Sequence, residues 1–276
     1  MPAPESVVLI EPTVHRRPWV LLLTALVVLG GLGVGAFLVL RGDDKPTFAL
    51  DRAAAAAGTT KWTEMQITME SQGQSITMNS KGDTDKGLAR MSMDLGAIVG
   101  SSSPIDMIID TKNDTMYMGG AFLTALGAKV DTPWVKIDRA TLEKAGQDAS
   151  AFDQLDVGNQ LAPATLFASA VSVRHLGRET IDGEQLQHDE VTVDTAKLVA
   201  VNPFLKRTMD KAGATLPTTI TYQVFITKDN EIRRLTYEVT AGTDKVKLTV
   251  VSHALTAAPG IEVPAEADVT DLADLR

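Results

Sequence analysis

Apolar and polar side chains alternate along much of the chain beyond residue 61, most sharply in segments rich in methionine. In the first such segment Met65, Ile67 and Met69 take every second position, with polar side chains between them. Because successive side chains of a strand point to opposite faces, the pattern predicts a β-sheet with one wet face and one apolar face. The same spacing recurs at Ile76 and Met78; at Met91, Met93 and Leu95; at Ile105, Met107 and Ile109; and at Met116 and Met118.

Methionine dominates the apolar side of these predicted strands, since eight of the ten methionines of the chain fall between Met65 and Met118. The side chain is unbranched and polarisable, so a surface made of it adapts to irregular apolar shapes instead of fixing one tight packing. Such a face suits a cavity for an apolar ligand. It equally suits an ordinary core in which methionine fills gaps, and the pattern alone leaves both interpretations open.

The last third of the chain predicts a three-stranded meander. The turn Asp229-Asn230 separates its first two strands, and a turn at residues 242–244 separates the last two. Short turns between neighbours indicate antiparallel pairing. The apolar positions of the three strands are Ile220, Tyr222, Val224 and Ile226; Leu235, Tyr237 and Val239; and Val246, Leu248 and Val250.

Two more strands, over residues 171–178 and 185–194, are expected just before the meander, joined by a turn at residues 181–183. Both halves together give about ten or eleven strands, which is too many to stay flat, so the sheet should curl. The predicted fold class is therefore α+β. We expect a curled antiparallel half-barrel whose concave apolar face is covered by helices, preceded by one transmembrane helix.

Several short helices are predicted around these strands. Asp138 can cap a helix that ends at Gly146, and Asn159 can cap one that reaches Ala170. Pro203 interrupts a helical spacing of apolar residues, so two consecutive helices fit residues 195–212 better than one. A first helix, over residues 50–57, is expected to pack on the sheet.

A short apolar stretch between Gly119 and Gly127 contains Phe122, Leu123 and Leu126. It is a candidate lid over the mouth of a cavity. The alternative is a small helix packed in the core.

The run Trp19–Leu40 contains no charged residue and is long enough to span the hydrocarbon core of a bilayer as a helix. It is too long for the apolar part of a cleaved signal, so we predict an uncleaved anchor with its N-terminus in the cytoplasm. Gly31 and Gly35 have a spacing that could let two such helices dimerise. The predicted organisation is a tail at 1–18, the anchor at 19–40, a linker or first helix at 41–60 and one domain at 61–276.

The chain is acidic, with a formal net charge of −9, which makes nucleic acid an unsuitable partner. Cysteine is absent, which excludes disulfides, thiolate metal sites and a cysteine nucleophile. The four histidines, His15, His175, His188 and His253, share no metal-ligand spacing, and no common hydrolase motif occurs. We therefore expect neither an enzyme nor a bound metal or cofactor. An extracytoplasmic hydrolase that uses His175 or His188 is the alternative.

Several motifs resemble the LolA-like fold, and in particular the LppX and LprG type of actinobacterial lipid-carrier lipoproteins. The resemblance spans residues 61 to about 272. Its motifs are Asp-Thr-Met-Tyr-Met at 114–118, Trp-Val-Lys-Ile-Asp at 134–138, the run at 173–183 leading into Val-Thr-Val-Asp at 191–194, Leu-Pro-Thr-Thr at 216–219 and Ile-Glu-Val-Pro at 261–264. The family is usually tethered by a lipidated cysteine, which this chain lacks, so the apolar helix would replace that tether.

The resemblance implies an extracytoplasmic half-barrel in the cell envelope that holds the acyl chains of a phospholipid or glycolipid. It implies that the inward alternate positions of the strands line the ligand. These are Met65, Ile67, Met69, Ile76, Met78, Met91, Met93, Leu95, Ile105, Met107, Ile109, Met116 and Met118 from the methionine segments, and Ile220, Tyr222, Val224, Leu235, Tyr237 and Leu248 from the meander.

A permanently anchored carrier cannot cross the envelope freely. It would accept a lipid at the membrane and present it to a nearby partner, such as an envelope transporter. The alternative function is a signalling or regulatory ectodomain that senses lipid or lipoprotein and controls a membrane partner.

Overall fold

The computed structural model describes residues 52–53, 60–71, 73–94, 104–125, 129–144, 167, 169–201, 217–241 and 244–275. The predicted cytoplasmic tail, membrane anchor and glycine pair all lie outside these residues, so those predictions stay predictions. Among the helices of the described ranges, none is both long and apolar enough to cross a bilayer.

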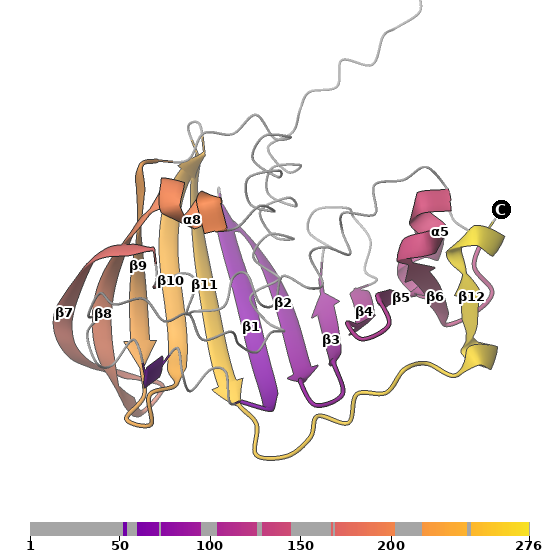
Figure 1. Ribbon diagram of the computed structural model, residues 1–276, viewed down its shortest axis with the longest axis horizontal. Helices are drawn as coiled ribbons and strands as arrows, with labels where there is room; N and C mark the ends of the chain where they lie inside the picture. The colour runs from indigo at the N-terminus through magenta and orange to yellow at the C-terminus, as the bar shows by residue number, and fades with distance from the viewer. Residues whose placement is uncertain are drawn as a thin grey trace, which may run out of the picture.

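Twelve strands form a single sheet in the order β12-β6-β5-β4-β3-β2-β1-β11-β10-β9-β8-β7 (Figure 1). Two meanders therefore lie side by side, because β1 pairs with β11 where the early and late halves of the chain meet. The strands are β1 (Trp62–Ser71), β2 (Gln74–Asp83), β3 (Leu88–Met93), β4 (Ile105–Asp110), β5 (Thr115–Gly119), β6 (Trp134–Asp138), β7 (Ala170–Ile181), β8 (Glu184–Asp194), β9 (Thr219–Ile226), β10 (Ile232–Ala241), β11 (Asp244–Ala254) and β12 (Val269–Asp271).

The sequence predicted ten or eleven strands, all antiparallel, and this was wrong at one edge of the sheet. The described residues contain twelve strands, and β12 pairs parallel with β6. Figure 1 shows why: the chain leaves β11, passes along the lower edge of the sheet and reaches its far side before β12 begins. A strand of three residues is too short to show an alternating pattern.

The predicted turns are present where the structure describes them. Asp182 and Gly183, between β7 and β8, both have positive φ, 52° and 83°, as a two-residue hairpin turn requires. Asn230 between β9 and β10 also lies in the left-handed region, with φ 63°. Tight turns at these two places join β7 to β8 and β9 to β10 as the antiparallel pairs that the sequence predicted.

Helices are few and short in the described part of the chain. Asp138 caps α5 as predicted, since its Oδ1 accepts the backbone N–H of Thr141 at 2.7 Å, and this bond lowers the pKa of the carboxyl group. Arg52 and Ala53 are helical, and Ala53 is fully buried in the core. The elements are α4 (Gly120–Ala125), α5 (Arg139–Lys144), α8 (Thr195–Val201), η3 (Glu266–Asp268) and η4 (Leu272–Asp274).

The other helix predictions lie largely outside the described residues. Of the helix expected from Asn159 to Ala170, the structure describes Phe167, which is helical and 8% exposed, but Ala170 is not helical and instead begins β7. The first of the two helices expected in 195–212 is α8, and Leu198 on it is buried. The segment after Pro203, as well as the expected helix end at Gly146, is not among the described residues.

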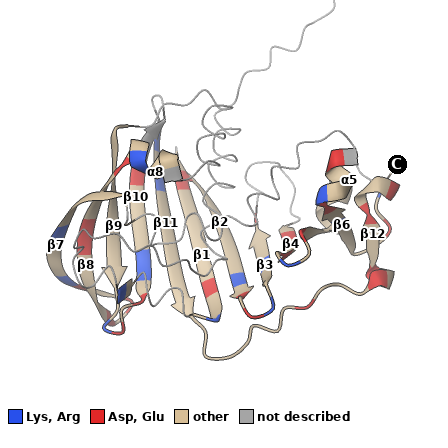
Figure 2. Ribbon diagram, viewed as in Figure 1, with Lys and Arg blue, Asp and Glu red and all other residues tan. Residues whose placement is uncertain are grey.

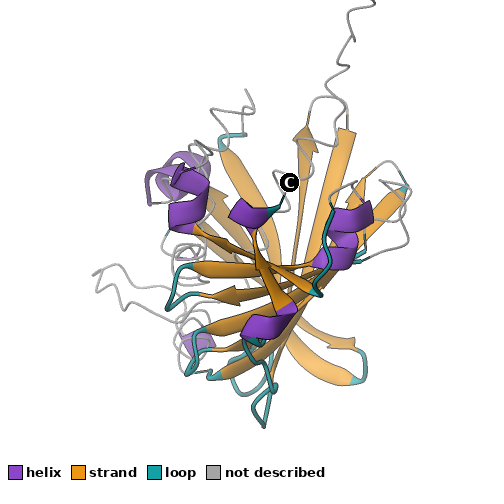
Figure 3. Cartoon of the chain, turned by 90° about the vertical axis from the view of Figure 1, so that its right-hand side faces the viewer, coloured by secondary structure: helices purple, strands orange, loops and turns teal. Residues whose placement is uncertain are grey.

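The sheet is curled rather than flat, because its strands fan through a wide angle in the view of Figure 3. One face, which we call the inner face, carries Met65, Ile67 and Met69 and is buried under α8 and other apolar residues. The opposite, outer face carries the intervening polar side chains. Figure 2 shows many of the charged residues at the turns and strand ends, which leaves uncharged stretches along the middle of several strands.

The two edges of the sheet differ. At one edge, β12 is flanked by the short helices η3 and η4. At the other, β7 is long and mostly exposed, but its pairing with β8 shifts register twice, between Ala170 and Ser172 and between His175 and Gly177. Such bulges twist an edge strand and discourage pairing with another chain.

Candidate functional site

Side chains of the inner face form rows that cross the sheet from strand to strand, because directly paired residues share a face. The upper row is Val173, Val191, Tyr222, Tyr237, Leu248, Met69 and Ile76. The middle row is His175, Asp189, Val224, Leu235, Val250, Ile67, Met78, Met93 and Ile105. The lower row, here called the methionine row, is Met65, Ser80, Met91, Met107, Met118 and Val135.

Most of the predicted lining residues come together in one buried cluster. The cluster contains Met65, Ile67, Met69, Ile76, Met78, Met93, Ile105, Ile220, Tyr222, Val224, Leu235, Tyr237 and Leu248, and it also takes in Ala53, Phe167, Val191, Val193, Leu198, Ile226 and Val250. Protein side chains therefore fill the inner face over β1, β2 and β8 to β11. A ligand that lies on this part of the sheet has to displace them.

The inner face is less completely covered over β3 to β5. Met91, Met107, Met116 and Met118 are half-buried there, whereas Met69 on β1 is only 1% exposed. Met107 pairs with Met91 on one side and Met118 on the other, so the three side chains are direct neighbours across the strands. We call Met91, Met107, Met116 and Met118 the methionine strip. It is apolar and partly accessible. Met91 and Met107 pack against the core, and Met118 pairs with Met107.

Of the remaining predicted lining residues, Ile109 lies beside this strip and Leu95 lies outside the described ranges. Met116 and Met118 pack in a separate small cluster with Val135 and Ile137 of β6. Ile109 is 7% exposed and pairs with Met116. Leu95 is not among the described residues.

The stretch named as a candidate lid is a short helix, α4, that follows β5. Phe122 packs against the main core, and Leu123 packs against the small cluster of β5 and β6. Leu126 lies outside the described residues. Since Phe122 and Leu123 are both half-buried beside the methionine strip, α4 flanks the least covered part of the inner face.

Two tyrosines lie at the centre of the upper row. The rings of Tyr222 and Tyr237 are 4.9 Å apart between centroids and tilted by 56°. Burial raises the pKa of both hydroxyl groups well above the usual value, because the phenolate cannot be hydrated there. At neutral pH both side chains are therefore uncharged parts of the apolar face.

One carboxylate interrupts the middle row. Asp189 is fully buried, and its Oδ1 lies 2.5 Å from Nδ1 of His175. The side-chain amide of Gln187 donates to the same carboxylate at 3.0 and 3.3 Å. His175 itself is 56% exposed, so the buried charge is joined to solvent through the imidazole ring.

The other described histidines have separate partners. Nε2 of His188 lies 2.7 Å from the side-chain oxygen of Gln223, and its ring stacks on Phe225 with centroids 4.2 Å apart. His253 lies against Arg233 on the outer face. Within the described part of the chain, no three His, Cys, Asp or Glu side chains come together as metal ligands.

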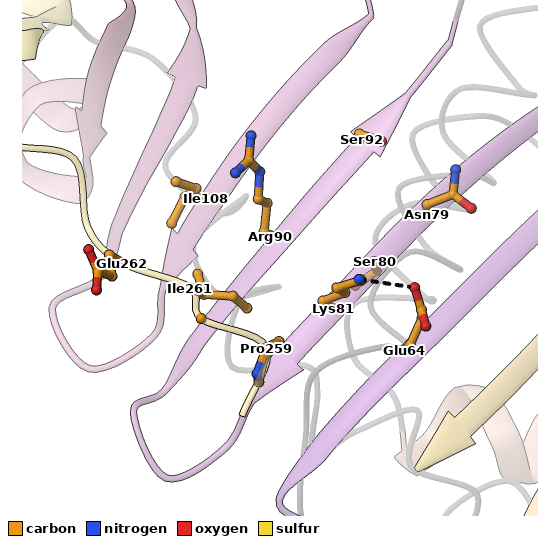
Figure 4. Close-up of a pocket in the computed structure, with 11 residues that line it drawn as sticks. Glu64, Asn79, Ser80, Lys81, Arg90, Ser92, Ile108, Pro259, Ile261 and Glu262 are labelled. Carbon is orange, nitrogen blue, oxygen red and sulfur yellow. Dashed lines mark ion pairs between the residues drawn. The ribbon is translucent and has the colours of Figure 1, made fainter. Parts of the chain in front are cut away.

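The outer face carries a hollow that the sequence did not predict. Its volume is about 360 Å³, and it lies between β1 to β4 and residues 259–262 (Figure 4). Polar and apolar groups share the lining about equally, and on its β1–β2 side Nζ of Lys81 pairs with the carboxylate of Glu64 at 3.3 Å. The full lining is Glu64, Asn79, Ser80, Lys81, Arg90, Ser92, Ile108, Pro259, Gly260, Ile261 and Glu262. None of the predicted ligand-lining residues is part of it.

Ile261 holds the C-terminal segment, residues 255–265, to this face. Its side chain is 4% exposed and packs with Leu88, Ile108 and Tyr117. Its carbonyl oxygen accepts a bond from Nζ of Lys86 at 3.1 Å. Val263, another β-branched apolar residue of this segment, is 40% exposed, so apolar character alone could not have singled out Ile261 from the sequence.

No known family model matches the chain, and no curated protein is similar to it in sequence. Several solved structures resemble it at a distance. Lipoprotein LppX of Mycobacterium tuberculosis is 11% identical with a TM-score of 0.45, over 78% of this chain and 96% of that one. LprF of Mycobacterium bovis is 13% identical with a TM-score of 0.46, over 79% and 94%.

The MucA/MucB complex of Pseudomonas aeruginosa also matches, at 14% identity and a TM-score of 0.35, over 79% of this chain and 58% of that one. The matches thus include a lipoprotein that the sequence resemblance had pointed to. Likenesses at this level assign no ligand to the chain.

Proposed function

We propose that this chain binds the acyl chains of a lipid on the inner face of its sheet, over the methionine strip. The observation that carries the proposal is a continuous apolar surface that is fully covered over most of the sheet and only half covered over β3 to β5. Soluble domains rarely leave a large contiguous apolar surface accessible unless it binds something. A partly accessible apolar strip beside a short helix is instead suited to an apolar guest.

The chemistry of the strip favours an alkyl chain over a rigid ligand. Methionine side chains have three rotatable bonds and can move to fit chains of different length and saturation. Each buried methylene of the ligand contributes about 0.8 kcal/mol, so a chain of ordinary length binds firmly without any polar contact. The proposed site therefore selects for apolar length more than for a particular headgroup.

The anchoring and location follow from the sequence and belong to the same proposal. Residues 19–40 would hold the chain in the cell membrane, with the sheet on the extracytoplasmic side. In that position the protein would take a lipid from the membrane and present it to an envelope partner. It would act as a carrier and not as an enzyme.

The test uses the full chain, purified in a detergent and incubated with a fatty acid that carries a photoreactive group along its alkyl chain. After illumination, mass spectrometry of the digested protein should place most of the label on β3, β4 and β5. Native mass spectrometry of the same preparation should show retained lipid. Label spread evenly over the apolar face of the whole sheet, or absent altogether, would contradict the proposal.

A matched pair of variants sharpens the result. Met107→Glu puts a carboxylate into the middle of the strip, where an adjacent alkyl chain would have to desolvate it, and labelling should fall more than tenfold. Thr249→Glu adds the same charge to the outer face of β11 and should leave labelling unchanged. Equal labelling of the two variants would show that the strip is not the site.

A further inference from the structure

The alternation of β2 places the side chain of Ser80 on the inner face, although the residue also borders the outer hollow, and its buried hydroxyl group makes no hydrogen bond. The residue is 3% exposed, and Oγ has no partner in the protein. Buried polar atoms without a partner are rare, because removing a hydroxyl from water without replacing its bonds is unfavourable. An orphaned hydroxyl on a proposed ligand surface therefore needs a physical reason.

Two other buried hydroxyl groups in the described ranges are paired. Thr115 Oγ1 donates to the carbonyl of Asn113 at 2.9 Å. Thr227 Oγ1 accepts the backbone N–H groups of Asp229 and Glu231 at 3.3 and 3.1 Å. A second unpaired hydroxyl, Thr195 Oγ1, belongs to the first residue of α8 and lies away from the methionine row.

The position of Ser80 distinguishes it from these residues. It stands in the methionine row, directly opposite Met65 on β1 and Met91 on β3. Both neighbours are thioether side chains, which are weak acceptors. Met65 belongs to the buried core, whereas Met91 is only partly buried and can adjust to a ligand more easily. Met91 is half-buried, so the strip opens toward Ser80 from the side of β3.

We infer that Ser80 Oγ donates a hydrogen bond to an ester carbonyl of the bound lipid. This assignment rests on the proposed function. An ester carbonyl fits better than a ligand hydroxyl, because it accepts a bond and brings no further donor that the apolar surroundings would leave unpaired. Since each ester joins an acyl chain to the rest of the lipid, the bond would fix how far the chain extends along the strip.

The experiment compares two lipids that differ in the carbonyl groups alone. The full chain in a non-lipid detergent is equilibrated with an equimolar mixture of a diacyl phosphatidylcholine and the dialkyl ether phosphatidylcholine of the same chain length. Retained lipids are quantified by mass spectrometry. The wild type should retain the ester lipid over the ether lipid by about fivefold, the preference that one net hydrogen bond of ordinary strength supports.

Ser80→Ala should abolish this preference while the retained ether lipid stays unchanged. Because the hydroxyl has no partner in the protein, the variant should also unfold at the same or a slightly higher temperature, which separates loss of the bond from loss of the fold. Ser92→Ala is the control, since it removes a hydroxyl from the outer face of the neighbouring strand β3 and should keep the ester preference.

Equal retention of both lipids by the wild type, or an unchanged preference in Ser80→Ala, would overturn the role of Ser80 and leave the proposed function standing. Retention of neither lipid would refute the proposed function, and the role of Ser80 with it.

Discussion

Replacing His175 with alanine should destabilise the protein, although more than half of the imidazole is exposed to solvent. The reason lies in Asp189, which is fully buried in the middle row of the inner face. Its carboxylate is held by His175 at 2.5 Å and by the amide of Gln187 at 3.0 Å. Without the imidazole, one side of a buried charge loses its donor.

The expected size follows from how far water can replace the lost partner. Removing one member of a fully buried ion pair typically costs 3–5 kcal/mol, and leaving a buried polar group unpaired costs about 1–3 kcal/mol. The exposed position of His175 lets some water reach the carboxylate after the substitution. We therefore expect His175→Ala to lower the free energy of unfolding by about 2 kcal/mol.

A second substitution removes the cause of that loss. The row neighbour Val224 and the next inward residue on β8, Val191, are both fully buried, so Asp189→Val extends an apolar surface and leaves His175 free to face solvent. We expect Asp189→Val to change stability by less than about 1 kcal/mol. In that background, His175→Ala should cost less than about 0.5 kcal/mol.

Urea denaturation followed by circular dichroism measures all four proteins of this double-mutant cycle. The coupling energy between the two sites should be about 1.5 kcal/mol. If His175→Ala costs the same in both backgrounds, the imidazole contributes by packing alone, and the explanation through the buried carboxylate is wrong.

Three further predictions concern the rest of the fold. Burial raises the pKa of all three tyrosines, Tyr117, Tyr222 and Tyr237. Their contribution to the free energy of unfolding is therefore full below pH 10 and is lost as the pH rises through the raised pKa values. Ultraviolet titration should show tyrosinate appearing together with alkaline unfolding, and tyrosinate in the folded protein near pH 10 would contradict this. Asp138→Ala should lower the free energy of unfolding by about 1 kcal/mol, because it removes the N-cap of α5. This loss should disappear in acid, where the carboxyl group of the wild type is protonated and no longer caps the helix as a carboxylate. An equal loss at all pH values in urea denaturation would exclude capping as the cause. Ile261→Ala should cost about 2–3 kcal/mol in urea denaturation, whereas a neutral result would mean that the C-terminal segment contributes nothing to the outer face.

Local alternation was sufficient to predict most of the sheet. The faces of β1, β9, β10 and β11 follow from period-two patterns such as Met65, Ile67 and Met69, since one face of each strand is buried and a shift by one residue would expose it. The hairpin at Asp182-Gly183 was equally legible, because its residues suit positive φ. What alternation could not show is that β1 pairs with β11, since no local signal records a partner so distant in the chain.

The candidate site was predicted less completely. Sequence reasoning placed the methionines on one face but could not tell the filled core at Met69 from the half-covered strip at Met107, because coverage depends on helices that pack from elsewhere. The burial of Asp189 could not be predicted from the sequence for a related reason. Asp189 interrupts the alternation of apolar and polar residues along β8, and the sequence does not show that His175 on the neighbouring strand is its partner.

The pairing of β1 with β11 also affects how the protein is made. During synthesis, β1 to β6 leave the ribosome well before β11, so the apolar side of the first meander must wait without the neighbour that completes the sheet. The hairpins of the first meander can form at once. The pairing of β1 with β11, however, requires contact between early and late parts of the chain, which slows folding. The methionine-rich meander is therefore the part of the nascent chain most in need of a chaperone.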